Sequence, residues 1–487
     1  MKLHTLLDQI EVLALTAEPD LEITGVSYDS RKVQPGDLFV AVTGFAADGN
    51  RFIPMALEKG AAAVVSAQPP RDNVPWVQVP SDRVALAALG GNWYGHPARE
   101  MQVIGVTGTN GKTSVTTLLK ALLEDQLGAK VGLIGTVGNC IGNTMLPTER
   151  TTPESFELQG LLRQMADAGC THVIMEVSSH ALALERVGGI RFDVAAFTNL
   201  TEDHLDFHKT MDAYAEAKAL LFGRCGKAVI NVDDDYAPRM VSAAQCPVCT
   251  TSVHDEAQLT ARNVTLFPDR VEFSACYDGE TVPVALGIPG QFTVYNALTV
   301  LGIGLQLGLT LAQCAAGLAK AKGVPGRVEV VPTLGMDFTV LIDYAHTPDG
   351  LENVLNAARV GAKGRLISVF GCGGDRDPMK RPIMGRIGVE LSDLAIITSD
   401  NPRTEDPMSI VDQIVKGIPI QCEHYVTICD RRQAIAYALG IARAGDVIVL
   451  AGKGHETYQE VNGVKRHLDE REEVAAWLAA QKEANGL

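Results

Sequence analysis

The 487-residue sequence is poor in cysteine and in positive charge, and each shortage removes a class of protein. Ten cysteines are too few for the disulfide framework of a secreted scaffold. The C-x-x-C of Cys246 and Cys249 has no second pair beside it, so structural thiols are favoured over zinc or redox chemistry. Forty-two Lys and Arg face 58 Asp and Glu, and the net charge of -16 has the wrong sign for binding nucleic acid or an anionic membrane.

Long apolar runs are missing as well. No stretch of about 18 uncharged apolar residues occurs, which predicts no membrane insertion. Asp8 and Glu11 interrupt the N-terminal run before the apolar core of a signal peptide develops, so we expect a cytoplasmic protein. At roughly 150 residues per domain, the length predicts about three domains.

Glycine- and proline-rich turns divide the chain into three segments. The first ends near Tyr94 to Ala98, and a second turn-rich stretch lies at Lys322 to Arg327. The predicted domains are therefore residues 1–98, 99–328 and 329–487. Within the first, strands are expected over residues 22–26, 38–42 and 61–66, with a helix over residues 53–60.

The other two segments alternate apolar runs with helical patterns, which is typical of α/β domains with mostly parallel sheets. Strands of the middle segment are expected over residues 101–106, 131–134, 173–177, 194–197 and 228–232, and a helix over residues 112–127 that stops at Gly128. Strands of the third are expected over residues 338–342, 366–370, 394–397 and 447–450. Because the carboxyl ends of parallel strands form ligand crevices, the third segment should bind a ligand.

The strongest local signal is the stretch Gly108 to Thr113, between an expected strand and an expected helix. Backbone N–H groups of such a loop can cradle phosphates, Lys112 can reach the outer phosphates, and the Thr113 hydroxyl can bind Mg²⁺. Val106 replaces the first glycine of the strict phosphate-loop pattern. Nucleotide binding is nevertheless favoured over a plain glycine turn.

Three residues are candidates for a metal site. Glu176 follows an apolar run, where its carboxylate could hold a magnesium ion bridged to phosphates or form a buried salt bridge. His204 could belong to the same site, could pair with His208 on zinc, or could be structural; magnesium ranks first because of the phosphate loop. Lys218 by itself would be read as a solvated helical lysine.

Several motifs in order resemble the Mur ligase family over essentially the whole chain. They are Gly108 to Thr113, Glu176 to His180, Asn199 to Asp206, Asp343 to Pro348 and Gly452 to Glu456. Asp400-Asn401-Pro402-Arg403 is similar to the motif of members that add meso-2,6-diaminopimelate. The resemblance implies an ATP-dependent amide ligase that joins this amino acid to UDP-N-acetylmuramoyl-L-alanyl-D-glutamate through an acyl phosphate, in cytoplasmic peptidoglycan precursor synthesis.

The resemblance also implies a fold and a set of contacts. The fold has an N-terminal uridine-binding α/β domain, a central P-loop ATPase with a mostly parallel sheet, and a C-terminal Rossmann-like domain. Implied contacts to the UDP-sugar peptide are Tyr28, Ser30, Phe45, Ala46, Ala47, Thr151, Thr152, Ser178 and Arg186. Implied contacts to ATP are Gly108, Thr109, Asn110, Gly111, Lys112, Thr113, Ser114, Asn296, Arg327 and Asp343.

The remaining implied residues serve the amino acid and the metal. Diaminopimelate would meet Arg376, Asp400, Asn401, Pro402, Arg403, Gly452 and Glu456. Mg²⁺ would be held by Thr113, Glu176, His204 and Lys218, the last carbamylated to N6-carboxylysine. Lys112 and Lys218 are the implied catalytic residues, and a monomer is expected.

Competing functions come from two classes. Folylpolyglutamate synthetase and the ligase that adds D-alanyl-D-alanine share the phosphate loop and the metal site, but the D-N-P-R motif of Asp400 to Arg403 argues against both. A P-loop regulatory or motor ATPase would release phosphate without a carboxylate or an amine substrate. A nucleotide-sensing scaffold would leave Lys218 and the D-N-P-R motif without a purpose.

Overall fold

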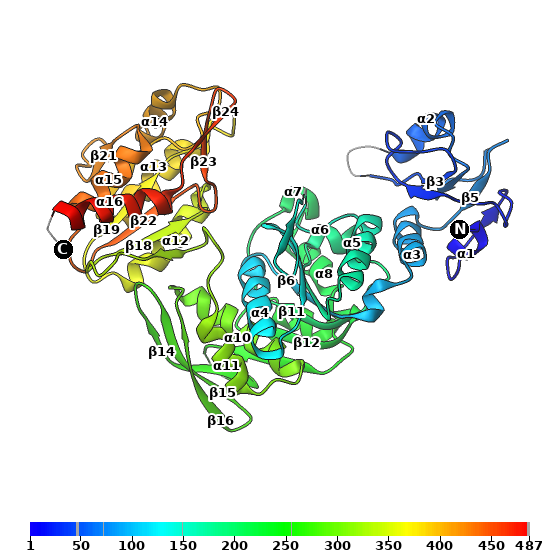
Figure 1. Ribbon diagram of the computed structural model, residues 1–487, viewed down its shortest axis with the longest axis horizontal. Coiled ribbons are helices and arrows are strands. Elements are labelled where there is room, and N and C mark those ends of the chain that lie inside the picture. The colour runs from blue at the N-terminus through cyan, green and yellow to red at the C-terminus, as the bar shows by residue number, and fades with distance from the viewer. Residues whose placement is uncertain (45–47, 72, 149, 255, 485–487) are drawn as a thin grey trace. The chain divides into compact units, whose positions relative to one another are not determined.

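The computed structural model describes residues 1–44, 48–71, 73–148, 150–254 and 256–484 (Figure 1). The chain forms two compact units, residues 1–259 with 299–310, and residues 260–298 with 311–487. This division does not follow the three predicted segments, whose boundaries stay a prediction. All ten cysteines are free thiols. Within the described part of the chain no helix is long and apolar enough to cross a membrane.

The first unit opens with a five-stranded sheet in the order β1-β5-β4-β3-β2, parallel except for β1 at one edge. Its strands are β1 (Ala14–Leu15), β2 (Gly25–Ser27), β3 (Asp37–Val40), β4 (Ala63–Ser66) and β5 (Trp76–Gln78). The helices are α1 (Leu3–Leu6), η1 (Gly49–Phe52), α2 (Ile53–Glu58), α3 (Asp82–Tyr94) and η2 (Pro97–Glu100). The strand expected over residues 22–26 begins only at Gly25, because residues 22 and 23 pair with the first residues of the chain, where the Ile23 N–H donates to the Met1 carbonyl at 2.8 Å.

The same unit contains the larger, central sheet, in which β7, β10, β6, β11, β12 and β13 are parallel neighbours in that order. The antiparallel strands β8 and β9 extend it beyond β7. The strands are β6 (Gln102–Thr107), β7 (Val131–Gly135), β8 (Gly138–Ile141), β9 (Thr144–Leu146), β10 (His172–Glu176), β11 (Phe192–Phe197), β12 (Cys225–Asn231) and β13 (Val248–Ser252). The mostly parallel order confirms the sequence prediction.

Helices connect the strands of this sheet. They are α4 (Lys112–Leu127), α5 (Ser155–Asp167), α6 (Ser179–Ala183), α7 (Leu205–His208), α8 (Met211–Ala219), η3 (Phe222–Arg224) and α9 (Ala237–Ala243). Helix α4 packs on β6, β7 and β10. It has the predicted bounds and ends at Gly128, whose φ of 60° is left-handed.

The second unit contains strands β14 (Leu259–Leu266), β15 (Val271–Tyr277) and β16 (Glu280–Leu286), with α11 (Leu311–Lys320) packed on β16. Helix α10 (Gln291–Gln306) begins in this unit. A six-stranded sheet follows in the order β17-β18-β22-β19-β20-β21, parallel except for β17 at one edge. Its strands are β17 (Glu329–Val331), β18 (Thr339–Asp343), β19 (Leu366–Phe370), β20 (Leu394–Ile397), β21 (Tyr425–Thr427) and β22 (Val447–Ala451).

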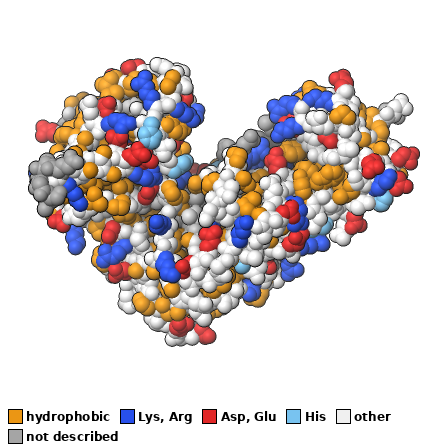
Figure 2. Space-filling view, in the orientation of Figure 1, with side chains coloured by type: hydrophobic (Ala, Val, Ile, Leu, Met, Phe, Trp, Pro, Cys, Tyr) orange, Lys and Arg blue, Asp and Glu red, His pale blue; other side chains and the backbone are white. Residues whose placement is uncertain are grey.

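Alternating side chains bury both faces of the six-stranded sheet. Val447 and Val449 share a core with α12 (Pro348–Gly361), α13 (Lys380–Leu391) and α14 (Pro407–Val415). Ile448 and Leu450 face α15 (Arg431–Ile441) and α16 (Glu470–Ala484) instead. Burial on both faces explains the unbroken apolar runs in the sequence. The hairpin of β23 (Tyr458–Val461) and β24 (Val464–His467) completes the unit. On the face in Figure 2, acidic and basic side chains are interspersed.

Candidate active site

The predicted phosphate loop joins β6 to α4. A Cβ on Gly108 would collide with the Thr198 hydroxyl, and Gly111 has a φ of 85°, so both positions favour glycine. The backbone N–H of Thr109 donates to the Asn199 carbonyl at 2.8 Å, and that of Asn110 donates to the Asn199 side chain at 2.9 Å. The loop is therefore held on the residues after β11, with α4 starting directly behind it.

Two lysines meet at the same carbonyl of this loop. Lys112 Nζ donates to the carbonyl oxygens of Gly108 and Thr109, each at 2.8 Å. Lys218 Nζ also donates to Gly108, at 2.8 Å, and lies 4.5 Å from the centre of the Tyr214 ring. The Lys218 side chain is only 1% exposed. Burial and, second, the charge of Lys112 lower the pKa of Lys218 well below its usual value, which favours a neutral amine.

Glu176 connects the phosphate loop to the neighbouring strand ends. Its carboxylate is 1% exposed and accepts hydrogen bonds from the Thr113 hydroxyl at 3.0 Å and from the Thr136 N–H at 3.0 Å. The Thr136 hydroxyl also donates, at 3.1 Å. Thr136 was not among the residues expected from the sequence, although it directly follows β7, and polar residues at the carboxyl ends of parallel strands are candidates for a site. The carboxylate and the Thr113 hydroxyl are oxygen donors of the type that suits Mg²⁺.

The two histidines of the sequence hypothesis take different places. His204 is exposed, with its ring 4.9 Å from the His180 ring and 6.1 Å from the Tyr214 ring, and no contact joins it to Glu176 or Lys218 in the described structure. His208 is buried, and its Nε2 lies 2.8 Å from the Ser179 hydroxyl. Across the described ranges, no three His, Cys, Asp or Glu side chains gather as a metal centre.

The residues implied for the substrate peptide lie beside Glu176. The Thr152 hydroxyl donates to the Glu176 carbonyl at 2.8 Å and lies 3.4 Å from the Ser178 hydroxyl. The Thr151 hydroxyl lies 3.0 Å from that of Thr136. A continuous polar path thus runs from Thr151 through Thr136 and Glu176 to the phosphate loop.

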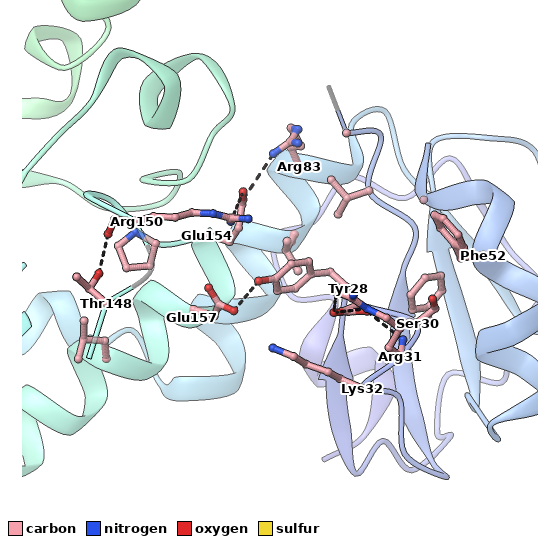
Figure 3. Close-up of a pocket in the computed structure, with 18 of the residues that line it drawn as sticks. Tyr28, Ser30, Arg31, Lys32, Phe52, Arg83, Thr148, Arg150, Glu154 and Glu157 are labelled. Atoms are coloured by element: carbon pink, nitrogen blue, oxygen red, sulfur yellow. Dashed lines mark hydrogen bonds and ion pairs between the residues drawn. The ribbon is translucent and has the colours of Figure 1, made fainter. Parts of the chain in front are cut away.

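Glu154 gathers three arginines at the edge of a large cavity, and sequence reasoning did not single it out. Its carboxylate lies 2.9 Å from Arg186 Nε. It also lies 3.1 Å from Arg150 Nη1 and 3.6 Å from Arg83 Nη1 (Figure 3). One carboxylate cannot neutralise three guanidinium groups. With Glu157 on the same wall, three guanidinium groups face two carboxylates, a small excess of positive charge for phosphate or carboxylate groups.

The cavity itself has a volume of about 1070 Å³ and is lined by Tyr28 and Ser30, as the resemblance implied, and by Arg31, Lys32 and Arg83. The Tyr28 hydroxyl donates to Glu157 at 2.6 Å, which with burial raises the pKa of Tyr28 (Figure 3). Phe45, Ala46 and Ala47 lie outside the described residues. Asp29, Glu154 and Glu157 also line the cavity, so its basic side chains exceed its carboxylates by only one. The volume and the arginine and lysine side chains suit a phosphorylated ligand.

In the second unit, two of the residues implied for the rest of ATP lie around β18, and the third lies in α10. Asp343 is buried at the strand end and accepts from the N–H groups of Val328 and Ala345, both at 2.8 Å; burial nonetheless raises its pKa. The Arg327 guanidinium lies 5.1 Å from the centre of the Tyr344 ring. Asn296 is buried in α10.

The loops after β20 and β22 meet in a buried polar cluster. Asn401 Nδ2 donates to Glu456 at 2.8 Å, and Lys453 Nζ donates to both residues, at 3.1 Å each. Lys453 has no exposed surface and was missed as a candidate. Asp400 is 6% exposed, and its Oδ2 has no hydrogen-bond partner in the described structure. Gly452 lies against that oxygen, with a φ of 117° and no room for a Cβ.

Arg403 and Arg376 lie at the rim of this cluster. Arg403 Nη1 donates to the Gly374 carbonyl at 2.7 Å, while its Nε lies 3.7 Å from Glu460, a distance typical of a weak ion pair. Arg376 is exposed and contacts the Asp375 carbonyl. The Pro402 carbonyl accepts from the Glu405 N–H at 3.0 Å, which closes the turn. Both arginines thus have donors available for a ligand carboxylate.

A buried ion pair supports both loops. Arg431 and Glu470, 0% and 1% exposed, lie 2.8 Å apart. Arg431 also donates to the carbonyls of Ala451 at 2.8 Å and Ser399 at 3.4 Å, the residues that precede Gly452 and Asp400. Arg431 is therefore a positioning residue for the ligand loops, and nothing in its local sequence marks it as one.

Replacing Arg431 by methionine is expected to lower the free energy of unfolding by about 3–5 kcal/mol, because Glu470 would keep a buried charge without a partner. The matched control is Arg432→Met: the Arg432 side chain is 47% exposed and its partner Glu473 is partly exposed, so its loss should cost about 0–1 kcal/mol. Urea unfolding followed by circular dichroism measures both. Equal stability of the two variants would contradict the assigned role.

Comparison with known proteins identifies the family. The Mur ligase middle domain matches residues 106–304, the Mur ligase glutamate ligase domain residues 326–454, and the Mur ligase family catalytic domain residues 22–94. A curated relative from Clostridium tetani is 46% identical over 481 residues, covering 97% of this chain and 98% of the relative. The chain belongs to the Mur ligase family.

Two curated relatives and one solved structure have the same enzyme name. The Clostridium tetani protein is a UDP-N-acetylmuramoyl-L-alanyl-D-glutamate--2,6-diaminopimelate ligase, as is a protein from Gloeobacter violaceus that is 46% identical over 488 residues and 99% of both chains. A solved structure of that name is 34% identical, with a TM-score of 0.78 over 99% of each chain. The MurF ligase of Thermotoga maritima with ADP, 20% identical and with a TM-score of 0.59 over 96% of this chain and all of that one, shares the fold. The three-domain α/β Mur ligase fold is confirmed.

Proposed function

We propose that this Mur ligase joins meso-2,6-diaminopimelate to UDP-N-acetylmuramoyl-L-alanyl-D-glutamate, with ATP converted to ADP and phosphate, in peptidoglycan precursor synthesis. The observation that carries the proposal is the polar cluster after β20 and β22. There, Arg403 at the rim can bind a carboxylate, because its Nε makes only a weak ion pair with Glu460, and the buried carboxylate of Asp400 provides negative charge near an ammonium group. The printed names of the full-length relatives support the same pair of substrates.

The other residues of this cluster define the amino-acid subsite. Asn401 and Glu456 add polar atoms for the ammonium and carboxylate groups, and Arg376 adds a second guanidinium. Pro402 and Gly452 shape the loops that present them. A diamino dicarboxylic acid has two groups of each charge, so a subsite with both carboxylates and arginines matches its chemistry.

The reaction proceeds in two displacements. The D-glutamate side-chain carboxylate attacks the γ-phosphorus of ATP and ADP leaves, which converts a poor leaving group into phosphate. The amine of diaminopimelate then attacks the acyl carbon, phosphate leaves, and the nitrogen loses a proton as the amide forms. Lys112, with the N–H groups of the first turn of α4, offsets the charge on the transferring phosphoryl group. Asn296, Arg327 and Asp343 are the proposed contacts for the adenine, the phosphates and the ribose.

Mg²⁺ fits the residues around Glu176. The buried carboxylate and the Thr113 hydroxyl, 3.0 Å apart, are two oxygen donors, and His204 lies on a nearby loop. When bound, the metal ion would neutralise phosphate charge and polarise the phosphoryl oxygens. Lys218 is the fourth proposed donor, as N6-carboxylysine. Burial favours its neutral amine, which can attack CO₂ and lose a proton, so that a neutral nitrogen group becomes an anionic oxygen donor.

The UDP-sugar peptide is assigned to the cavity of Figure 3. Its phosphates and carboxylates suit the arginines around Glu154, including Arg186, and the hydroxyls of Thr151, Thr152 and Ser178 lie on the path to Glu176. Tyr28 and Ser30 are the proposed contacts at the other end, with Phe45, Ala46 and Ala47 assigned from the resemblance alone. All three substrates are assigned to residues of one chain, so the proposed monomer needs no residue from a second copy, and the use of ATP supports a cytoplasmic reaction.

The test is substrate-dependent phosphate release. We expect release only when ATP, the UDP-linked dipeptide and meso-diaminopimelate are all present, with one phosphate formed for each amide bond. Phosphate release that ignores the dipeptide and the amino acid would instead identify a motor or regulatory ATPase. Use of a folate or of D-alanyl-D-alanine in place of these substrates would identify a sibling ligase.

Arg403→Ala is expected to lower kcat/KM for meso-diaminopimelate by about 10²-fold, because the distal carboxylate loses a planar, two-donor partner. Its low activity with L-lysine, which lacks that carboxylate, should change little. Arg403→Lys keeps the positive charge but lacks the planar pair of N–H donors, so it should recover only part of the lost kcat/KM. Arg386→Ala, which removes an exposed arginine of α13, is the control and should leave both rates unchanged. An equal loss with both amino acids would refute the assignment.

A further inference from the structure

The Arg403 side chain is held across two loops, its own after β20 and the loop of residues 371–377 after β19. Its Nη1 donates to the carbonyl of Gly374 in the second loop at 2.7 Å. The loops are in close contact there, because a Cβ on Gly374 would collide with the Pro402 carbonyl. The position of this guanidinium group therefore depends on where Gly374 lies relative to the loop after β20.

An ion pair fixes the residues on both sides of Gly374. Arg381 of α13 is 1% exposed and donates to both oxygens of the Glu405 carboxylate, each at 2.8 Å. Arg381 Nη2 also donates to the Gly373 carbonyl at 3.3 Å. Glu405 in turn accepts from the Asp375 N–H at 2.6 Å. The ion pair thus holds the loop after β19 against the loop after β20.

Each of the two loops contains a residue in a backbone conformation that L side chains rarely adopt. Asp375 has a φ of 54° and Arg403 has a φ of 50°, both in the left-handed region. Such residues persist where the surrounding contacts hold them in place. The Thr404 hydroxyl adds to those contacts, since it donates to the Asp375 carboxylate at 2.6 Å. Loss of the contacts between the loops would therefore let both residues relax.

The ion pair stays charged at neutral pH and lies beneath the loops. Hydrogen bonds from Arg381 are the main reason that the pKa of Glu405 falls to about 2. Arg381 Nη1 has a further acceptor in Gln413 of α14, at 2.8 Å, so this side chain also joins the two helices behind the loops. Because Arg381 is buried, it cannot itself touch the amino acid. Any effect that it has on substrate choice must act through the loops.

We propose that Arg381 and Glu405 are positioning residues that set the selectivity of this enzyme for an amino acid with a second carboxylate. Their ion pair holds Gly374 in place, and the Gly374 carbonyl holds the Arg403 guanidinium where the distal carboxylate of meso-diaminopimelate binds. The inference rests on the proposed function, because it takes Arg403 as the contact for that carboxylate. L-Lysine lacks the carboxylate, so its use depends much less on this ion pair.

Selectivity between the two amino acids tests the kinetic effect. The double variant Arg381→Met/Glu405→Ala removes both charges of the pair, so neither is left buried without its partner and the protein should fold. We expect kcat/KM for meso-diaminopimelate to fall about tenfold, and kcat/KM for L-lysine to change by less than about twofold. The control Arg386→Met/Glu390→Ala makes the same replacements in an exposed ion pair of α13 and should leave both values unchanged. If the double variant kept the selectivity of the unmodified enzyme, whether both values fell equally or neither fell, the proposal would be wrong.

Hydrogen exchange of the free protein tests the positional effect without any substrate. The Gly374 N–H donates to the Asn401 carbonyl at 2.9 Å, a contact between the loops that neither substitution removes directly. In Arg381→Met/Glu405→Ala, peptides of residues 371–377 and 400–406 should exchange about tenfold faster, while peptides of β19 and β22 keep their protection and show that the sheet is folded. Unchanged exchange in the two loops would refute the positioning role.

A second variant keeps the test independent of one substitution. Glu405→Gln preserves the size of the side chain and removes its charge, so it should lower the selectivity by a smaller factor, about threefold. If the unmodified enzyme forms no amide with meso-diaminopimelate, the proposed function fails, while faster exchange in the two loops still supports the ion pair as their link. If the unmodified enzyme is selective and both variants are equally selective, only the positioning role fails.

Discussion

Lys112→Ala is expected to lower kcat by about 10³-fold and to leave the protein folded. The amine of Lys112 donates only to carbonyls of its own loop, at 2.8 Å, and supports no apolar core. Its contribution lies in the charge it offers to the phosphoryl group as that group moves. Steady-state phosphate release gives the rate, and thermal unfolding shows that the fold persists.

The matched control for Lys112→Ala lies two turns along the same helix. Lys120 pairs with Glu124 at 2.6 Å on the side of α4, away from the phosphate loop. Lys120→Ala removes the same charge and the same side-chain length, so its rate should stay within about twofold of the unmodified enzyme. If Lys112→Ala retained the unmodified rate, the phosphate-loop assignment would be wrong.

Lys218→Ala is expected to abolish nearly all turnover, and a small carboxylate such as acetate should restore part of it. The reason is the proposed anionic donor: alanine removes the carbamate, and acetate can place an oxygen ligand in the space beside Tyr214. Rates measured across a range of acetate concentrations, for the variant and the unmodified enzyme, give the rescue.

The variant Lys218→Arg tests whether position 218 must form a carbamate or must only have a positive charge. A guanidinium keeps the cation but cannot take up CO₂, so this variant should stay inactive and should not respond to acetate, because the side chain fills the space. Full turnover by either Lys218 variant would refute the carboxylysine proposal. Thermal unfolding of both variants shows whether the buried position tolerates the change.

The fold was predictable from the sequence where glycine and burial mark the elements. Helix α4 has the predicted bounds because Gly111 and Gly128 stand at its two ends. The strands of the third segment were recognisable because burial on both faces makes their apolar runs continuous. The start of strand β2 was predicted too early. Ile23 is apolar and buried, as a strand residue would be, but its backbone N–H donates to Met1 and not to the neighbouring strand.

Candidate site residues could be named from the sequence only where they lie together in one short motif. The phosphate loop and the D-N-P-R turn are of this kind. Thr136 and Glu176 are 40 residues apart, and only the pairing of β7 with β10 brings the hydroxyl to the carboxylate. Glu154 and Lys453 were missed for the same reason: a carboxylate with three arginines, or a lysine between Asn401 and Glu456, becomes visible only after folding.

The central claim, that this enzyme adds meso-diaminopimelate, is tested most directly by competition between two amino acids. The unmodified enzyme is given ATP, the UDP-linked dipeptide and equal amounts of meso-diaminopimelate and L-lysine, and the two products are separated by mass. The account predicts that the diaminopimelate product exceeds the lysine product by about 10²-fold or more, because lysine would leave Arg403 without a carboxylate partner. Equal amounts of the two products would contradict it.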